Sequence, residues 1–208
     1  MIDFPAATAV DRRIPKEAFY KRLPLTKALK ERFVSDVERI VVENCLTKES
    51  LNLTADSEIG EILLVSIALK KKAFDAKIIE AIAKQNPHKL VFLLTFGNSG
   101  QLALYHGKLY RAEWAPLEEL SLSAKGHSLS EIWDGLIEQI ALTGEVAGAG
   151  RSIDERLALR ERIIKLEKLI QKTEAAAWKE QQPKKRFELY SKMQGYKKEL
   201  EQLKCAKR

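Results

Sequence analysis

The sequence predicts an α+β protein: a small mixed β-sheet domain packed with helices, followed by a C-terminal helical hairpin or coiled coil. Two runs, "EILLVSIAL" and "KLVFLLTF", are almost continuously apolar, as in strands buried on both faces. The segment between them has the apolar spacing of a helix, and residues 151–208 carry two stripes of coiled-coil periodicity. A content of 45% hydrophobic and 31% charged residues over 208 positions fits a folded chain rather than a disordered one.

The first 60 residues predict an irregular arm over 1–15 and a short helix over 15–23. A longer helix is expected over 25–44, because Leu29, Phe33, Val37, Ile40 and Val41 form one apolar stripe at helical spacing. A connection follows, with a short strand at 51–53.

The middle of the chain predicts a strand at 61–71, a helix at 75–86 and a strand at 89–96. A strand–helix–strand unit of this kind forms a parallel pair. Strands at 101–106 and 108–114, joined at Gly107, should continue as an antiparallel meander. The last helix of this domain begins at Ser128, where "SLSE" has the spacing of a capping box.

The sequence predicts a domain at 1–143 and a helical tail at 151–208, separated by a linker of small residues at 144–150. Charge is divided unevenly between the domain and the tail. Residues 1–150 hold 19 Lys and Arg against 20 Asp and Glu, whereas the tail holds 17 against 9. The basic tail indicates an anionic partner, although charge alone does not separate nucleic acid from an acidic protein. A second basic cluster, which includes Arg12, Arg13 and Lys16, lies near the N-terminus and suits ordered docking.

The tail carries an apolar seam that recurs at steps of four and three on both sides of Pro183. Two helices around a proline predict an antiparallel hairpin, and the alternative is one long, kinked helix in an intermolecular coiled coil. Each stripe is narrow, so each helix needs the other or a partner. The seam positions are Leu159, Ile163, Leu166, Ile170, Leu189, Met193, Tyr196, Leu200 and Leu203.

The basic side chains form a second class of candidate contact, either with nucleic acid or with a protein partner. An apolar stripe demands burial, whereas phosphate binding needs only charge, so we expect the seam to matter more for assembly than the basic residues. The alternative is that these charges only solvate a helix. The candidate contact residues are Arg12, Arg13, Lys16, Lys184, Lys185, Arg186, Lys197 and Lys198.

Sequence motifs of catalysis are not found. The chain has no P-loop, no dinucleotide-binding glycine fingerprint and no HExxH, and its three histidines lack ligand spacing. Glu61 and Lys70 flank a core strand, but a metal-dependent nuclease needs a second carboxylate, and Ala68 occupies the place where it would be useful. We therefore expect no catalytic residue, no metal site, no cofactor and, on balance, no enzyme.

The longest apolar stretch, "ILLVSIAL", is too short to span a bilayer, and the N-terminus lacks the apolar segment of a signal peptide. These features predict a cytoplasmic protein with no membrane partner.

Five segments, "RIPKEAFY", "LKERF", "LNLT", "EILLVSIALK" and "KEQQPKKRFELYSKMQGYKKELEQL", resemble the bacterial domain-of-unknown-function family four-three-nine-one. The resemblance covers nearly the whole chain. It implies a genomic setting beside helicase-like ATPases and DNA methyltransferases of restriction and phage-defence loci, and it implies no catalytic residue.

Taken with the residues, this resemblance leads us to expect a non-catalytic accessory or interaction subunit of such a system. Its partner would be a helicase-like ATPase, a methyltransferase or a second copy, bound through the hairpin, with nucleic acid as a secondary ligand. The alternatives are a degenerate, metal-dependent nuclease-like DNA-binding protein and a regulatory binder of the toxin–antitoxin type.

Overall fold

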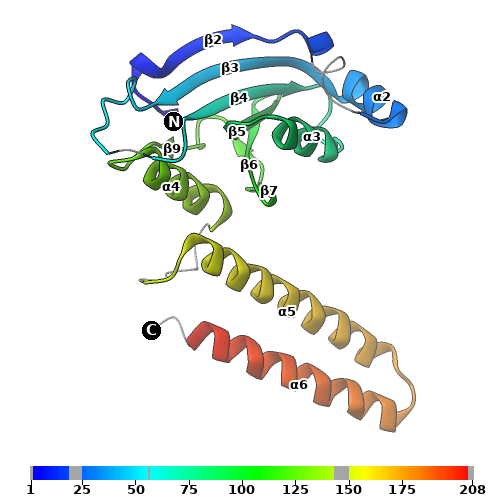
Figure 1. Ribbon diagram of the computed structural model, residues 1–208. Coiled ribbons are helices and arrows are strands. Elements are labelled where there is room, and N and C mark those ends of the chain that lie inside the picture. Colours follow the sequence, from blue (N-terminus) through cyan, green and yellow to red (C-terminus); the bar gives the residue numbers. More distant parts are fainter. Residues whose placement is uncertain (1, 19–24, 56, 143–149, 206–208) are drawn as a thin grey trace. The chain divides into compact units, whose positions relative to one another are not determined.

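The computed structural model describes residues 2–18, 25–55, 57–142 and 150–205 (Figure 1). The chain divides into two compact units, Met1–Ala141 and Leu142–Arg208, and each is described by itself. Most of the expected linker and of the expected helix at 15–23 lies outside the described residues.

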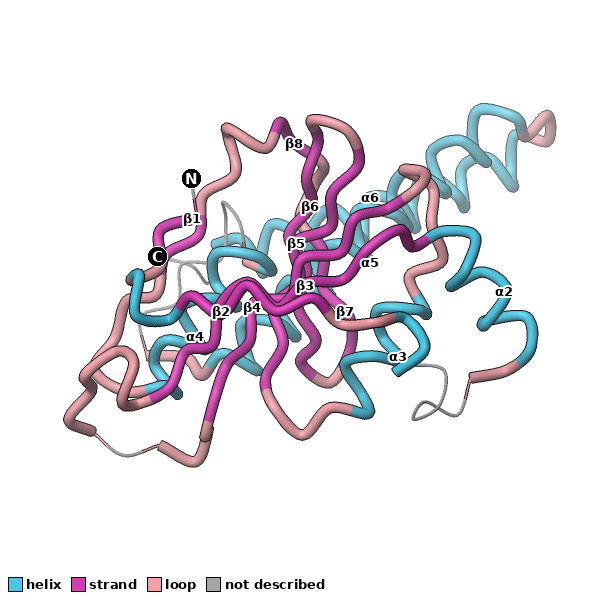
Figure 2. The backbone as a smooth tube through the Cα atoms, turned by 90° about the horizontal axis from the view of Figure 1, so that it is seen from above, coloured by secondary structure: helices cyan, strands magenta, loops and turns pink. Residues whose placement is uncertain are grey.

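A seven-stranded mixed sheet forms the centre of the first unit (Figure 2). Six strands follow the order β2-β3-β4-β5-β6-β7, and β8 also pairs with β6. Only β4 and β5 are parallel; the other pairs in this sheet are antiparallel, as the strand–helix–strand unit and the meander predict. The strands of this sheet are β2 (Ala9–Arg13), β3 (Val37–Thr47), β4 (Glu61–Leu69), β5 (Lys89–Phe96), β6 (Ser99–His106), β7 (Lys108–Arg111) and β8 (Ala115–Pro116).

Two further strands, β1 (Ile2–Asp3) and β9 (Leu122–Ser123), pair in parallel as a separate two-stranded sheet. A short 3₁₀ helix, η1 (Ala6–Thr8), connects β1 to β2.

Helices α2 (Lys27–Asp36) and α3 (Lys77–Gln85) contribute to a core on one face of the large sheet. Alternate side chains of β4 and β5, such as Val65 and Phe92, point to this face because a strand has a period of two. They share a buried cluster with Phe33 of α2 and Ile79 of α3, both of which have no exposed surface. This cluster is the main hydrophobic core on that side.

Helix α4 (Leu129–Ala141) covers the opposite face. Its Trp133 donates a hydrogen bond from Nε1 to Nδ1 of His106 (3.5 Å), and the Lys89 ammonium lies 5.6 Å from the Trp133 ring centre. Along β5 and β6, Lys89 and His106 occupy positions that alternate with the core residues, so their side chains point to the opposite face of the sheet. Helix α4 therefore lies on that face. The unit is therefore a three-layer arrangement of helix, sheet and helix.

The expected helix over 25–44 is wrong in its second half, where α2 ends at Asp36 and β3 begins at Val37. As far as Val41, the apolar positions fit the spacing of a helix as well as that of a buried strand. The segment "VERIVVENCLT" is rich in β-branched side chains, however, which favour a strand. The backbone of β3 is also hydrogen-bonded to strands on both sides, a long-range pairing that local spacing does not reveal.

Two other expectations for the first 60 residues are corrected. Part of the expected irregular arm is strand β2, which pairs with β3. The expected short strand at 51–53 is instead a turn, closed by the backbone N–H of Leu53, which donates to the carbonyl of Lys48 (2.9 Å).

The second unit is a helical hairpin of α5 (Ile153–Lys179) and α6 (Pro183–Cys205), which run side by side in opposite directions (Figure 1). Ser152 caps α5: its hydroxyl accepts from the Glu155 N–H while the Glu155 carboxylate accepts from the Ser152 N–H, which together form a capping box. Pro183 is the first residue of α6, where a missing N–H removes no helical hydrogen bond. The hairpin, and not a single kinked helix, is therefore the structure of the tail.

Candidate functional site

The seam is buried within the hairpin to different degrees. Ile163, Leu166 and Met193 are buried, with 4–6% of their surface exposed, whereas Leu159, Ile170, Leu189, Tyr196, Leu200 and Leu203 are partly buried. Among the described residues, ion pairs of Arg162 with Glu199 (2.6 Å) and of Lys204 with Glu167 (3.1 Å) join the helices. The seam thus holds the two helices together.

Three of the candidate basic residues gather at the loop end of the hairpin. Lys184, Lys185 and Arg186 follow Pro183 in the first turn of α6 and are exposed, and this turn contains no acidic residue. The amino end of a helix carries a partial positive charge, so cations there cost helix stability. Stabilisation of α6 therefore does not explain these three charges. Further along α6, Lys198 is exposed and Lys197 is partly buried.

Two aromatic side chains at the same loop end were not among the sequence candidates. Trp178, near the end of α5, is 76% exposed and Phe187, near the start of α6, is 73% exposed. They are the two most exposed large apolar side chains that the structure describes. The sequence contains a signal for Trp178: the spacing of four and three residues continues beyond Ile170 through Thr173 to Ala177, so the residue after Ala177 points away from the seam.

The candidate contacts near the N-terminus are divided between the two faces of the sheet. Arg12 and Arg13 are consecutive exposed residues of β2, so their side chains leave opposite faces, and each lines a different pocket. Lys16 is partly buried, and its Nζ donates to the carbonyl of Val37. Burial, together with the neighbouring charge of Lys70, lowers the pKa of Lys16.

Glu61 and Lys70, the acid and base considered for a nuclease, lie beyond each other's reach. They sit at opposite ends of β4, a separation of roughly 30 Å for nine residues of strand. The Lys70 ammonium donates instead to the carbonyl of Val34 (2.9 Å). The two side chains therefore cannot act on one phosphate.

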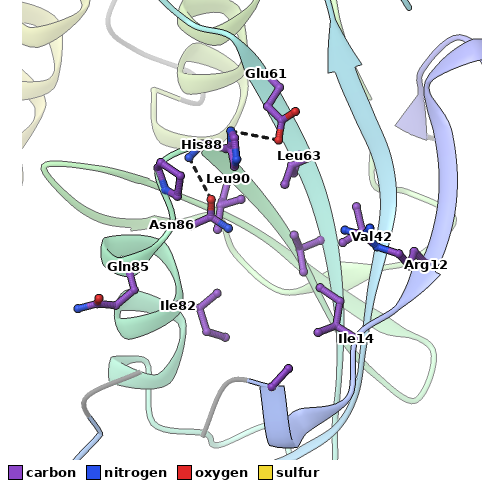
Figure 3. Close-up of a pocket in the computed structure, with 13 residues that line it drawn as sticks. Arg12, Ile14, Val42, Glu61, Leu63, Ile82, Gln85, Asn86, His88 and Leu90 are labelled. Carbon is purple, nitrogen blue, oxygen red and sulfur yellow. Dashed lines mark hydrogen bonds and ion pairs between the residues drawn. The ribbon is translucent and has the colours of Figure 1, made fainter. Parts of the chain in front are cut away.

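Glu61 is the centre of a small polar cluster at the start of β4 (Figure 3). Its Oε1 lies 3.1 Å from Nδ1 of His88, and its Oε2 accepts a long hydrogen bond from the Cys45 thiol (3.8 Å). Burial and the negative charge of Glu61 raise the pKa of Cys45, so the thiol stays protonated at neutral pH. A protonated thiol is a weak nucleophile, and this cluster is not arranged for covalent catalysis.

Asp36, at the junction of α2 and β3, is the most buried acid of the described chain, with 1% of its surface exposed. Its carboxylate lies 2.7 Å from the Lys71 ammonium and accepts from the Ser35 hydroxyl (2.6 Å) and the Asp75 backbone N–H (3.2 Å). Burial alone would raise the pKa of Asp36, but these hydrogen bonds outweigh it and hold the pKa below its ordinary value of 3.8. The group ties α2 to the segment before α3.

Within the described ranges, no group of three or more His, Cys, Asp or Glu side chains is placed to hold a metal ion. The helices of the same ranges include none with the length and apolar character needed to cross a bilayer.

The structure defines a mixed α+β protein that carries a C-terminal helical hairpin. The family model described as Domain of unknown function (DUF4391) matches residues 2–200, so the chain belongs to this family and the resemblance in the sequence is confirmed. No significant match was found among curated proteins or among solved structures.

Proposed function

We propose that this protein is a non-catalytic interaction subunit that docks onto a protein partner through the loop end of its hairpin. The observation that carries the proposal is the exposure of Trp178 and Phe187 beside three consecutive cations. Large aromatic side chains in water are common anchors of protein interfaces, and arginine is enriched there as well.

The cations indicate the chemistry of the partner. Lys184, Lys185 and Arg186 disfavour the helix that they begin, and an acidic surface would compensate this cost when it binds. Trp178 and Phe187 would enter an apolar groove on the same surface. The partner site is therefore an apolar groove bordered by carboxylates.

The setting that we propose is a cytoplasmic restriction or phage-defence assembly that contains a helicase-like ATPase or a DNA methyltransferase. Support comes from the genomic context that the family resemblance implies. Nucleic acid would be a secondary ligand of the basic residues, bound in a salt-dependent manner.

Co-purification of the full chain with the products of its neighbouring genes tests this function. We expect Trp178→Ser combined with Phe187→Ser to weaken partner capture at least about tenfold, the loss of one or two interface anchors. Charge reversal at Lys184, Lys185 and Arg186 should mainly slow association and change its salt dependence, because exposed charges steer encounter more than they hold a complex.

A matched control is Phe96→Ser, since Phe96 is exposed in the first unit at 38%. It should leave capture unchanged. If the aromatic double variant captures partner normally while the charge reversals abolish capture or DNA binding, the interaction is electrostatic and the proposed anchor role is wrong.

The nuclease alternative makes a different prediction. We expect purified protein, with Mg²⁺ or Mn²⁺ and end-labelled DNA, to cleave no faster than a buffer blank, because Glu61 and Lys70 are separated by roughly 30 Å of strand. Gel analysis over hours measures this. Cleavage by the wild type that Glu61→Ala abolishes would support the nuclease instead.

A further inference from the structure

A cavity of about 500 Å³ lies in the first unit between α3 and strands β2 to β5 (Figure 3). Its volume is in the range of pockets that bind small organic molecules. Figure 3 shows Ile82 and Gln85 of α3 on one side, Arg12 and Val42 on the other, and Glu61 with His88 at one end. The docking function proposed above does not use this pocket.

Strand pairing builds an apolar floor for the pocket. Val42 lies opposite Val65 in the β3–β4 ladder, and Leu63 lies beside Leu90 in the β4–β5 ladder. All four side chains line the cavity. An apolar floor of this kind binds the apolar body of a ligand by removing both surfaces from water.

An irregularity in β3 shapes the polar end. The register of β3 against β4 shifts between Val42 and Asn44, so one extra residue enters the strand. This shift turns Cys45 to the face that Val42 occupies, where its thiol reaches Glu61. Both oxygens of the Glu61 carboxylate then have a contact, one with Cys45 and one with His88.

Two further polar side chains on the wall, Arg12 and Asn86, offer hydrogen-bond donors, and Gln85 adds an amide that can donate or accept. Arg12 has no acidic partner among the residues that the structure describes, and its guanidinium carries five N–H donors. The Asn86 side-chain oxygen accepts from the backbone N–H of His88 (3.0 Å), which leaves its amide nitrogen to donate.

From this combination of an apolar floor, a Glu61 carboxylate in contact with Cys45 and His88, and a guanidinium with no acidic partner in the described part of the chain, we propose that the pocket binds a small organic anion. The ligand has a flat aromatic or branched aliphatic body, which lies on Val65, Leu63 and Leu90. Its carboxylate, sulfonate or phosphate group accepts hydrogen bonds from Arg12, with Asn86 as a second donor.

The proposal has two parts, binding of an apolar body and binding of an anionic group, and two dyes with the same apolar body test them separately. The probes are 8-anilinonaphthalene-1-sulfonate, an anion, and N-phenyl-1-naphthylamine, its uncharged analogue. Fluorescence titration of the full chain should show one saturable site for each dye. Arg12→Gln should weaken binding of the sulfonate about tenfold, as expected for loss of a charge-assisted hydrogen bond, and change binding of the neutral dye less than about twofold.

The adjacent Arg13→Gln is the matched control, because Arg13 leaves the opposite face of β2 and lines a different pocket. It should leave the affinity of both dyes unchanged. Leu63→Trp should fill the floor and weaken both dyes together, with native circular dichroism and thermal unfolding as a check on folding.

Three results would overturn the proposal. One is an absence of saturable binding to the wild type. The second is an Arg12→Gln variant that binds the sulfonate as the wild type does, or that loses no more affinity than Arg13→Gln. The third is a folded Leu63→Trp variant that binds both dyes normally.

Discussion

Replacement of Asp36 by alanine is expected to lower the free energy of unfolding by about 3 kcal/mol. This value is near the lower end of the range for breaking a buried ion pair, because the partner, Lys71, is half exposed. The change leaves the Ser35 hydroxyl, the Lys71 ammonium and the Asp75 N–H without their common acceptor. Asp36→Asn should lose less, since an amide oxygen still accepts one of these hydrogen bonds. Urea unfolding followed by tryptophan fluorescence measures both variants.

The effect of Asp36 should depend on pH with a definite sign. Its pKa is lower in the folded protein than the ordinary value of 3.8, so the charged form is stabilised by folding. The contribution is complete above that ordinary value and is lost as the pH falls through the lower, folded-state pKa. The stability difference between wild type and Asp36→Asn should therefore be constant near neutral pH and shrink below a pH of about 4.

Glu31→Ala is the control for this measurement, because Glu31 is an exposed acid on the same helix. It should change the free energy of unfolding by no more than about 0.5 kcal/mol. An Asp36→Ala variant that is as stable as Glu31→Ala would show that the buried carboxylate does not hold α2 in place.

Simultaneous substitution of Leu166 and Met193 by glutamate is expected to unfold the hairpin. These side chains are 5% and 4% exposed, and two carboxylates in their place would be buried without partners. Each helix has a narrow apolar seam, so neither is expected to stay folded alone. Helices α5 and α6 contain 27 and 23 residues, against 10, 9 and 13 in α2, α3 and α4, so circular dichroism at 222 nm should lose more than half of its helical signal.

The control is Lys184→Glu with Lys185→Glu, two exposed positions in the first turn of α6. This pair introduces the same number of carboxylates, places them where the helix dipole favours them, and should keep or slightly raise helicity. Retention of full helicity by the Leu166 and Met193 double variant would mean that the seam does not hold the hairpin together.

Local sequence was sufficient to predict the elements whose length, composition and spacing together fit one kind of secondary structure. The runs at β4 and β5 are short, apolar and bounded by breakers, and the tail repeats its seam over many turns. The boundary between α2 and β3 was not predictable, because Val37, Ile40 and Val41 satisfy both a helical stripe and a buried strand. Pairing with β2 and β4, which come from distant parts of the chain, decides between them.

The candidate site also has features that could be predicted from the sequence and features that could not. The seam positions and the basic residues of α6 follow from spacing and composition, and the structure places every seam residue in a buried or partly buried position. The contact of Glu61 with both Cys45 and His88 could not be predicted from the sequence, because it depends on the register of three strands and on the extra residue in β3. A single sequence contains no periodic signal for such a register shift.

Strand β2 lies at one edge of the large sheet, and its form determines what that edge can accept. All five of its residues are exposed, three of them are charged, and Asp11 has a positive φ of 43° where the register against β3 is irregular. An edge that is short, charged and bent offers no regular row of N–H and C=O groups to another chain. The sheet should therefore resist amyloid-like growth from this side, and a partner's extended peptide should not add here as a further strand.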